Sequence, residues 1–265
     1  MSKDYFNLNS YVCTNVGKVR QNNEDNFLFD GKIVDQMQSE LTFSQKTNTD
    51  NICLYGVFDG MGGHEQGEKA SLMSAMIARD FMVDEDYIAE GLNQICLRAN
   101  EDVCQEMKRL KQRIGSTASM VAFYKKDAHI CNIGDTPIYL YRNHTLYQLH
   151  EEHTERKMYE KIYGHATPNK KYRLTQNIGV FQEEMMIKPY VSTMEVLEGD
   201  CFIICSDGLT DMVSEEQIAH VLEAISKERQ VQVLESEALK AGGKDNITIM
   251  IIHVEKKSIF DRFRK

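Results

Sequence analysis

Four short β-like runs follow one another between residues 118 and 149, and they restrict the folds open to this chain. Each run is four to seven residues of mostly apolar, β-branched or aromatic character, and only short polar breaks separate them. Strands so closely spaced indicate antiparallel hairpins. The runs are Ala118–Tyr124, Ala128–Ile133, Pro137–Tyr141 and Leu146–Leu149.

The remaining patterns predict runs of strands alternating with pairs of helices. Predicted strands are Tyr5–Val16, Phe27–Phe29, Ile52–Phe58, Val191–Met194, Cys201–Cys205 and Ile247–Val254. Predicted helices are Glu65–Met82, Asp86–Lys111, Ser214–Ile225 and Gln230–Ala241, the third with a Ser-x-x-Gln capping signal at Ser214. The polar stretch Asp35–Asn51 predicts a loop, Asp59-Gly-Met-Gly-Gly a sharp turn, and residues 150–173 a surface excursion. Segregated runs of this kind favour an α+β fold.

Length and composition favour one domain. The chain has 265 residues, 42% of them apolar, so it can bury a sizeable core. Its three prolines stand alone, and no Gly/Ser-rich or Pro-rich linker divides it. We expect a single domain over residues 1–255 and a short basic tail over 256–265. The tail has two interpretations, a solvated terminus or a segment that docks on a membrane surface or partner.

Charge and cysteine usage narrow the setting of the protein. A net charge of −9 is unsuited to sequence-independent nucleic-acid binding. The seven cysteines are scattered and form no CxxC pair, so we expect reduced thiols in the core. The first residues lack the apolar core of a signal peptide, and no apolar run approaches the roughly 20 residues of a membrane span. The expected location is the cytoplasm.

Acidic residues stand at the ends of four β-like runs. Asp59 follows Ile52–Phe58, Asp207 follows Cys201–Cys205, Asp245 precedes Ile247–Val254, and Glu24-Asp25 precedes Phe27–Phe29. One such pair is ordinary turn chemistry. Four of them at element boundaries can converge on one rim of a sheet, where their mutual repulsion would raise their pKa values. Mg²⁺ or Mn²⁺ would remove that conflict, since both prefer oxygen ligands.

Six motifs in order resemble the PPM, or protein phosphatase 2C, family of Ser/Thr phosphatases. They span residues 17 to 250, and the Asp-Gly-Met-Gly-Gly-His form is typical of the bacterial branch. The motifs are Gly17-Lys-Val-Arg-Gln-Asn-Asn-Glu-Asp-Asn-Phe27, Val57-Phe-Asp-Gly-Met-Gly-Gly-His64, Gly115-Ser-Thr-Ala118, Asn132-Ile-Gly-Asp135, Ser206-Asp-Gly-Leu-Thr-Asp211 and Lys244-Asp-Asn-Ile-Thr248.

The resemblance implies a fold and a role for each matching residue. The fold is a four-layer α-β-β-α sandwich, two packed antiparallel sheets flanked by helix pairs. Two Mn²⁺ or Mg²⁺ ions would be held by Asp59, Gly60 through its carbonyl, Asp207, Asp245, Glu24 and Asp25. Asp135 and Asp211, with Asp207, match a third metal position. Arg20 would bind the substrate phosphate and Asn246 would support the cluster.

The resemblance also implies the reaction and the partners. The chain is expected to hydrolyse phosphoserine and phosphothreonine in proteins by direct attack of a metal-bridging water, opposing a Ser/Thr protein kinase and acting on that kinase and its targets. Two metals can lower the pKa of such a water and stabilise charge on the phosphoryl oxygens. A regulatory module on the same fold is the second hypothesis, although every expected carboxylate is present. A dinucleotide site at Gly60–Gly63 is rejected, because a second long helix follows instead of a strand.

Two points remain open. Eukaryotic relatives have a histidine directly after the Asp-Gly pair, where this chain has Met61, so the acid for the leaving group is unassigned. His64 could serve, or it could cap a helix. Residues 150–174 correspond to a variable flap beside the active site and carry six basic residues, which could recruit acidic phosphopeptides or could simply be solvated. These are Arg156, Lys157, Lys161, Lys170, Lys171 and Arg173.

Overall fold

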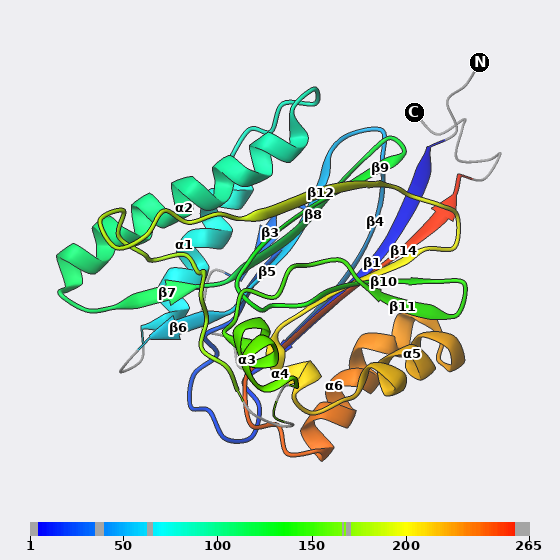
Figure 1. Cartoon of the computed structure of the whole chain (residues 1–265). Helices are drawn as coiled ribbons and strands as arrows, with labels where there is room; N and C mark the ends of the chain where they lie inside the picture. The colour runs from blue at the N-terminus through cyan, green and yellow to red at the C-terminus, as the bar shows by residue number, and fades with distance from the viewer. Residues whose placement is uncertain (1–4, 35–39, 63–65, 166, 168–170, 258–265) are drawn as a thin grey trace.

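The computed structural model describes residues 5–34, 40–62, 66–165, 167 and 171–257. Two six-stranded antiparallel sheets lie face to face, with one helix pair on each outer face (Figure 1). This is the α-β-β-α sandwich that the motifs imply, and the prediction of an α+β fold is confirmed.

The first sheet contains the first and last strands of the fold. Its order is β11 (Thr145–Gln148), β10 (Ile138–Arg142), β13 (Cys201–Cys205), β14 (Ile247–Lys256), β1 (Phe6–Asn15) and β4 (Glu40–Asn48). The second sheet has the order β12 (Tyr190–Glu195), β9 (Asp127–Ile133), β8 (Ala118–Tyr124), β5 (Cys53–Phe58), β2 (Asn26–Phe29) and β3 (Lys32–Ile33). All pairs are antiparallel, including the β8–β9 and β10–β11 hairpins predicted from the spacing.

Three apolar cores separate the four layers. Helices α1 (Gly67–Asp80) and α2 (Ile88–Leu110) bury Leu92 and Ile95 against the second sheet. Between the sheets, rings such as Tyr55, Phe123 and Phe202 pack edge to face. Helices α5 (Glu215–Ala224) and α6 (Gln230–Lys240) cover the outer face of the first sheet, and the 3-10 turn η1 (Lys227–Arg229) joins them. Burying apolar faces on both sides of each sheet requires this layering.

The prediction of a loop over Asp35–Asn51 is wrong, because β4 occupies Glu40–Asn48. This strand lies at the edge of its sheet and pairs only with β1. Leu41 and Phe43 pack on the core between the sheets, but Gln45 and Thr47 hydrogen-bond to Asp30 and Tyr55 instead. Polar side chains that find partners inside a sandwich obscure the apolar alternation from which a strand is predicted.

Several further short elements were not predicted, among them β6 (Gly60–Gly62), β7 (Ile114–Ser116) and α4 (Asp207–Thr210). The expected sharp turn after Asp59 contains strand β6, which pairs with β7. The four-residue helix α4 follows β13. Elements of three or four residues depend on tertiary pairing, and such short segments carry no periodicity.

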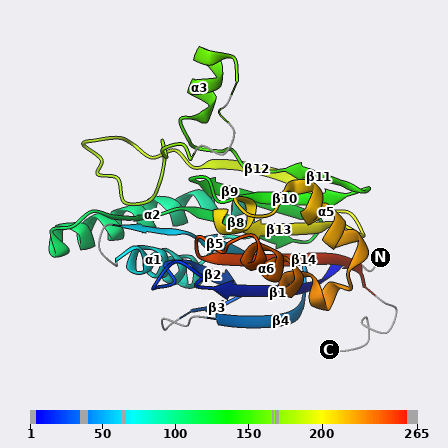
Figure 2. The same ribbon diagram turned by 90° about the horizontal axis from the view of Figure 1, so that it is seen from below.

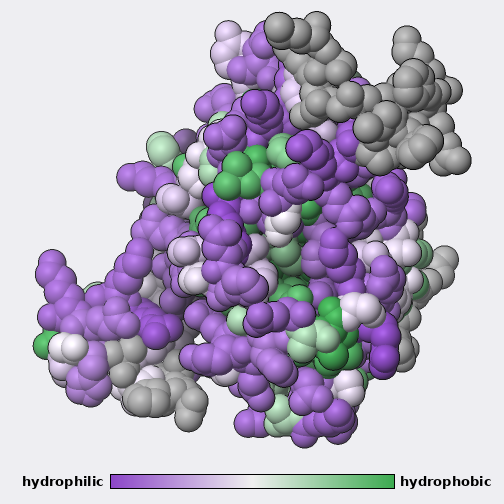
Figure 3. Space-filling view, turned by 90° about the vertical axis from the view of Figure 1, so that its right-hand side faces the viewer, coloured by the Kyte–Doolittle hydropathy of each residue, from purple (hydrophilic) through white to green (hydrophobic). Residues whose placement is uncertain are grey.

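The segment after β11 leaves the body of the sandwich. Helix α3 (Arg156–Tyr163) projects from one side of the molecule (Figure 2), in line with the predicted surface excursion. The face shown in Figure 3 is mostly hydrophilic, with hydrophobic residues in small separate patches. Among the described residues, every helix is too short or too polar to span a lipid bilayer.

Candidate metal centre

The four acidic clusters meet at one end of the sandwich. Asp59 leaves β5 and Glu24-Asp25 enters β2, both in the second sheet, whereas Asp207 follows β13 and Asp245 precedes β14 in the first sheet. Strands β2 and β5 are antiparallel neighbours in one sheet, and β13 and β14 are antiparallel neighbours in the other, so in each sheet the end of one strand lies beside the start of its neighbour. Because the two sheets face one another, these strand ends come together. The carboxylates of Asp25, Asp207, Asp135 and Asp245 all act on Asp59 electrostatically.

Burial and mutual repulsion raise the pKa values of the carboxyl groups in this cluster. Burial, with the neighbouring carboxylates of Asp25 and Asp207, raises the pKa of Asp59 well above its ordinary value. Burial also raises the pKa of Asp25 to about 7, and burial with the charge of Asp207 raises that of Asp135 to about 7. Carboxylates held in this way favour a bound cation, because a cation restores the stability of the ionised form.

Backbone contacts hold Asp59 and Gly60 in place. The hydroxyl of Thr117 accepts the Asp59 N–H at 3.0 Å, and the Asp59 carbonyl accepts from the Thr117 N–H at 2.9 Å. A Cβ atom on Gly60 would overlap the carbonyl oxygens of Glu24 and Gly67, so only glycine fits. The hydrogen-bonding role of Thr117 was missed, since a hydroxyl at the start of a strand has no sequence signal of its own.

Asn246 and Thr248 support the neighbouring acidic pair. Asn246 Oδ1 accepts the Glu24 N–H at 2.8 Å, and its Nδ2 donates to the carbonyls of Val16 and Asn22 at 2.9 Å each. The Thr248 hydroxyl donates to Asp25 Oδ2 at 2.7 Å. Glu24 itself accepts the Gly67 N–H at the start of α1. The loop before β2 is thus held by the side chains of Asn246 and Thr248, which lie 222 and 223 residues away from their partners Glu24 and Asp25 in the sequence.

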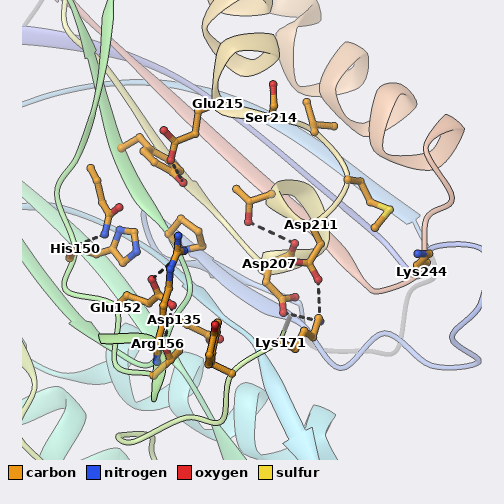
Figure 4. Close-up of a pocket in the computed structure, with 18 of the residues that line it drawn as sticks. Asp135, His150, Glu152, Arg156, Lys171, Asp207, Asp211, Ser214, Glu215 and Lys244 are labelled. Carbon is orange, nitrogen blue, oxygen red and sulfur yellow. Dashed lines mark hydrogen bonds and ion pairs between the residues drawn. The ribbon is translucent and has the colours of Figure 1, made fainter. Parts of the chain in front are cut away.

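The positively charged side chains of Arg20 and Lys171 contact the cluster. Arg20 Nη2 donates to Asp245 Oδ2 at 2.8 Å, with its side chain 47% exposed. Lys171, from the segment after α3, lies 2.9 Å from Asp207 Oδ2, 3.0 Å from Asp211 Oδ2 and 3.5 Å from Asp245 Oδ2. The close-up in Figure 4 shows Lys171 beside Asp207 and Asp211. The resemblance assigned Arg20 to the substrate phosphate, which stays a prediction, and Lys171 only to the flap.

The donor set fits divalent cations, with one rearrangement. Oxygen donors from carboxylates are the ligands that Mg²⁺ and Mn²⁺ prefer. Within the described part of the chain, however, no group of three or more His, Cys, Asp or Glu side chains is arranged to hold a metal ion as it stands. The Lys171 ammonium stands among three of the carboxylates instead.

The cluster opens on a pocket of about 950 Å³. Asp135, Asp207 and Asp211 line one part of it, Glu152 lies near Asp135, and Ser214 and Glu215 line the part farthest from these residues (Figure 4). The flap contributes Arg156 and Lys171 to its wall.

Other flap and loop predictions have mixed outcomes. Arg156 pairs with Glu152 and Glu160, and Lys157 pairs with Glu151, so these two cations are engaged inside the segment 150–174. Met61 lies in β6, and its side chain carries no proton to donate. His64, Lys170 and the tail beyond residue 257 lie outside the described residues.

A sandwich of two antiparallel sheets with a carboxylate cluster at one end and an arginine beside it is suited to metal-dependent hydrolysis of phosphate esters. The family model "Protein phosphatase 2C" matches residues 15–162, more than half of the chain. This chain belongs to the protein phosphatase 2C family. It is therefore a metal-dependent protein serine/threonine phosphatase, as the six motifs predict.

Bacterial phosphatases are among the relatives of this chain. The serine/threonine phosphatase stp of Listeria welshimeri is 28% identical over 256 residues, which cover 90% of this chain and 93% of the relative. The serine/threonine protein phosphatase PstP of Mycobacterium tuberculosis is 28% identical over 210 residues, 76% of this chain and 40% of that protein. The bacterial type predicted from the glycine-rich motif agrees with both.

Solved structures share the fold. The S. agalactiae serine/threonine phosphatase has a TM-score of 0.78 and 25% identity, covering 94% of this chain and 100% of that one. The catalytic domain of PstP, solved in complex with two manganese ions, has a TM-score of 0.76 and 23% identity, covering 94% and 99%. At that identity the second likeness shows the fold alone.

Proposed function

We propose that this chain dephosphorylates phosphoserine and phosphothreonine in cytoplasmic proteins, including a Ser/Thr kinase and its targets, with two Mn²⁺ or Mg²⁺ ions and an optional third. The observation that carries the proposal is the convergence of Asp59, Asp207 and Asp245 from both sheets beside Arg20. The two manganese ions of the PstP structure and the phosphatase relatives support it. The seven buried cysteines, all in the thiol form, are compatible with a reducing compartment.

Each residue has a part in the proposed reaction. Asp59, the Gly60 carbonyl, Asp207 and Asp245 would hold the cations, and Glu24 and Asp25 would complete the set. When bound, the cations lower the pKa of a water molecule and neutralise charge on the phosphoryl oxygens. Arg20 orients the substrate phosphate, because its planar guanidinium matches two phosphate oxygens and its side chain is half exposed.

Two further parts of the proposal concern the neighbourhood of these residues. Asp135 and Asp211 would join Asp207 at the third cation position, which the short distances around Lys171 support. Met61 cannot donate a proton, so we assign protonation of the leaving serine or threonine oxygen to a water molecule. Residues 1–255 would act as one phosphatase domain, because β1, near the start of this range, pairs with β14, near its end.

Hydrolysis of a phosphothreonine peptide tests the proposal. Activity should require added Mn²⁺ or Mg²⁺, and Asp207→Asn or Asp245→Asn should lower kcat by at least about 100-fold, since each removes a charged metal ligand. Asp86→Asn, an exposed aspartate between α1 and α2, is the matched control and should retain full activity. Robust hydrolysis in EDTA, or by the two variants, would contradict the proposal.

A further inference from the structure

Lys171 is a flap residue whose ammonium reaches into the acidic cluster. Its ammonium contacts three carboxylate oxygens, from Asp207 and Asp211 at either end of the α4 turn and from Asp245 before β14. By contrast, the ion pairs of Arg156 and Lys157 stay inside the segment 150–174. The Lys171 contacts therefore join the flap to the body of the molecule through the acidic cluster.

The residues that follow Lys171 in the sequence contact α3. The neighbouring Tyr172 hydroxyl accepts the Thr167 N–H at 2.7 Å, and its ring packs on Tyr159 of α3 with centroids 5.1 Å apart. The Arg173 carbonyl accepts the Glu155 N–H at 2.9 Å at the start of the helix. A displacement of Lys171 would therefore be felt at α3.

A metal ion and the Lys171 ammonium cannot share these oxygens. A divalent cation bound by the carboxylates of Asp207 and Asp211 would lie within a few ångströms of the ammonium, which is 2.9 and 3.0 Å from their Oδ2 atoms. Two positive centres a few ångströms apart in a partly desolvated site also repel strongly. Only one of them can occupy the position at a time.

We propose that Lys171 is a tethered cation that competes with the third metal ion, so that metal binding at Asp207 and Asp211 releases the flap. This inference rests on the proposed function of the same cluster and adds a regulation to it. With the ammonium in place, the flap is held against the pocket. With the metal in place, Lys171 is expelled and α3 is no longer tied to the cluster. Occupancy of this one position thereby couples metal concentration to the position of the flap.

Calorimetric titration with Mn²⁺ tests the competition directly. Lys171→Met removes the charge but keeps most of the length of a side chain that is 61% exposed, so the fold should persist. The weakest Mn²⁺ site should bind about tenfold more tightly in this variant, because the competing ammonium is gone. A tenfold change lies within the usual range of coupling between two sites. Asp211→Asn introduced into Lys171→Met should remove that gain. Lys161→Met, an exposed lysine on α3, is the matched control and should titrate like the wild type.

Release of the flap has a separate optical readout. The chain contains no tryptophan, so Tyr163→Trp would place a single reporter on α3. Adding Mg²⁺, which does not quench fluorescence paramagnetically, should lower the anisotropy of the reporter. With Lys171→Met as well, the anisotropy should already be low without metal.

The possible failures are distinguishable. Wild type and Lys171→Met that bind Mn²⁺ with the same stoichiometry and affinities would overturn the competition and leave the phosphatase proposal intact. An unchanged anisotropy on Mg²⁺ binding would overturn the release of the flap. If neither protein bound Mn²⁺ at all, the metal centre itself would be wrong, and the competition with it.

Discussion

Asn246 shows what a single side chain contributes to this site. It is 4% exposed, and its amide satisfies three backbone groups of the loop that carries Arg20 and Glu24. A buried amide with all of these partners fixes the path of the loop, because any displacement leaves polar groups without partners. Asn246 therefore positions Glu24 without touching a substrate.

Asn246→Ala should lower the free energy of unfolding by about 2–3 kcal/mol, since it strands a buried N–H and two carbonyls. Urea denaturation measures this loss, and Mn²⁺ titration should show weaker binding in the same variant. Asn51→Ala, at an exposed position after β4, should change neither quantity. A stable Asn246→Ala with normal Mn²⁺ affinity would contradict this positioning role.

At the scale of elements, α5 begins where its sequence predicts. Ser214 Oγ accepts the Gln217 N–H at 3.3 Å, and Gln217 Oε1 accepts the Ser214 N–H at 3.0 Å. The reciprocal pair is the capping box expected from Ser-x-x-Gln, so that prediction is confirmed. Local chemistry decided this boundary because both partners lie within one turn.

Ser214→Ala should destabilise the protein by about 1 kcal/mol, the usual cost of removing a helix N-cap. Thermal unfolding measures the shift. Ser226→Ala is the matched control, because Ser226 precedes η1 without a side-chain capping bond. Equal shifts in the two variants would mean that the capping bond contributes nothing.

The packing of α6 on the first sheet depends on a buried histidine. His253 of β14 hydrogen-bonds through Nε2 to Gln230 Oε1 at 2.7 Å, and Gln230 Nε2 donates to the carbonyls of Leu222 and Ile225 at the end of α5. Burial lowers the pKa of His253 to about 4. The neutral imidazole thus joins β14 to both helices.

The His253 contribution should be lost in acid. Its pKa is about 4 in the folded state and near 6.5 when unfolded, so the stability that it provides is complete above pH 6.5 and falls as the pH drops toward 4. The loss should be roughly 1.4 kcal/mol per pH unit in that window. We expect the difference in unfolding free energy between wild type and His253→Gln to decrease from pH 7.5 to pH 5.5. The exposed His220→Gln should show no such trend.

At the scale of the whole molecule, the candidate metal centre lies between both sheets. Its carboxylates stand next to the ends of β5 in one sheet and of β13 and β14 in the other. Asp135 lies in the connection between β9 of one sheet and β10 of the other. A cation bound here stabilises only the folded arrangement, since the unfolded chain separates these ligands by up to 221 residues. Metal binding and global stability are therefore linked.

Mn²⁺ at 100 times its dissociation constant should stabilise the protein by about 2.7 kcal/mol. Scanning calorimetry with and without EDTA measures this gain. Asp59→Asn should abolish it and should stabilise the metal-free protein, because it removes a carboxyl group whose ionised form is disfavoured by burial and by Asp25 and Asp207. Asp127→Asn, at the exposed start of β9, should leave both melting temperatures unchanged. A metal-free Asp59→Asn that melts lower than wild type would contradict the crowding argument.

Local patterns were sufficient for much of this fold. The run Ile52–Phe58, the two long helices and the capping box were all recognisable, because apolar periodicity and capping depend on residues a few positions apart. The strand-end aspartates were recognisable for the same reason, since each adjoins an apolar run. The resemblance of the six motifs then supplied the residues of the candidate centre.

Tertiary structure decided the features that depend on distant partners. Strand β4 exists because β1 pairs with it and because Asp30 and Tyr55 satisfy its inward polar side chains. Strand β6 exists because β7 lies opposite it. Lys171 contacts Asp207 and Asp245, which lie 36 and 74 residues away in the sequence. The residues next to Lys171 in the sequence carry no pattern that predicts these contacts. Hydrogen bonds and charges act through space, so only the folded chain brings these pairs together.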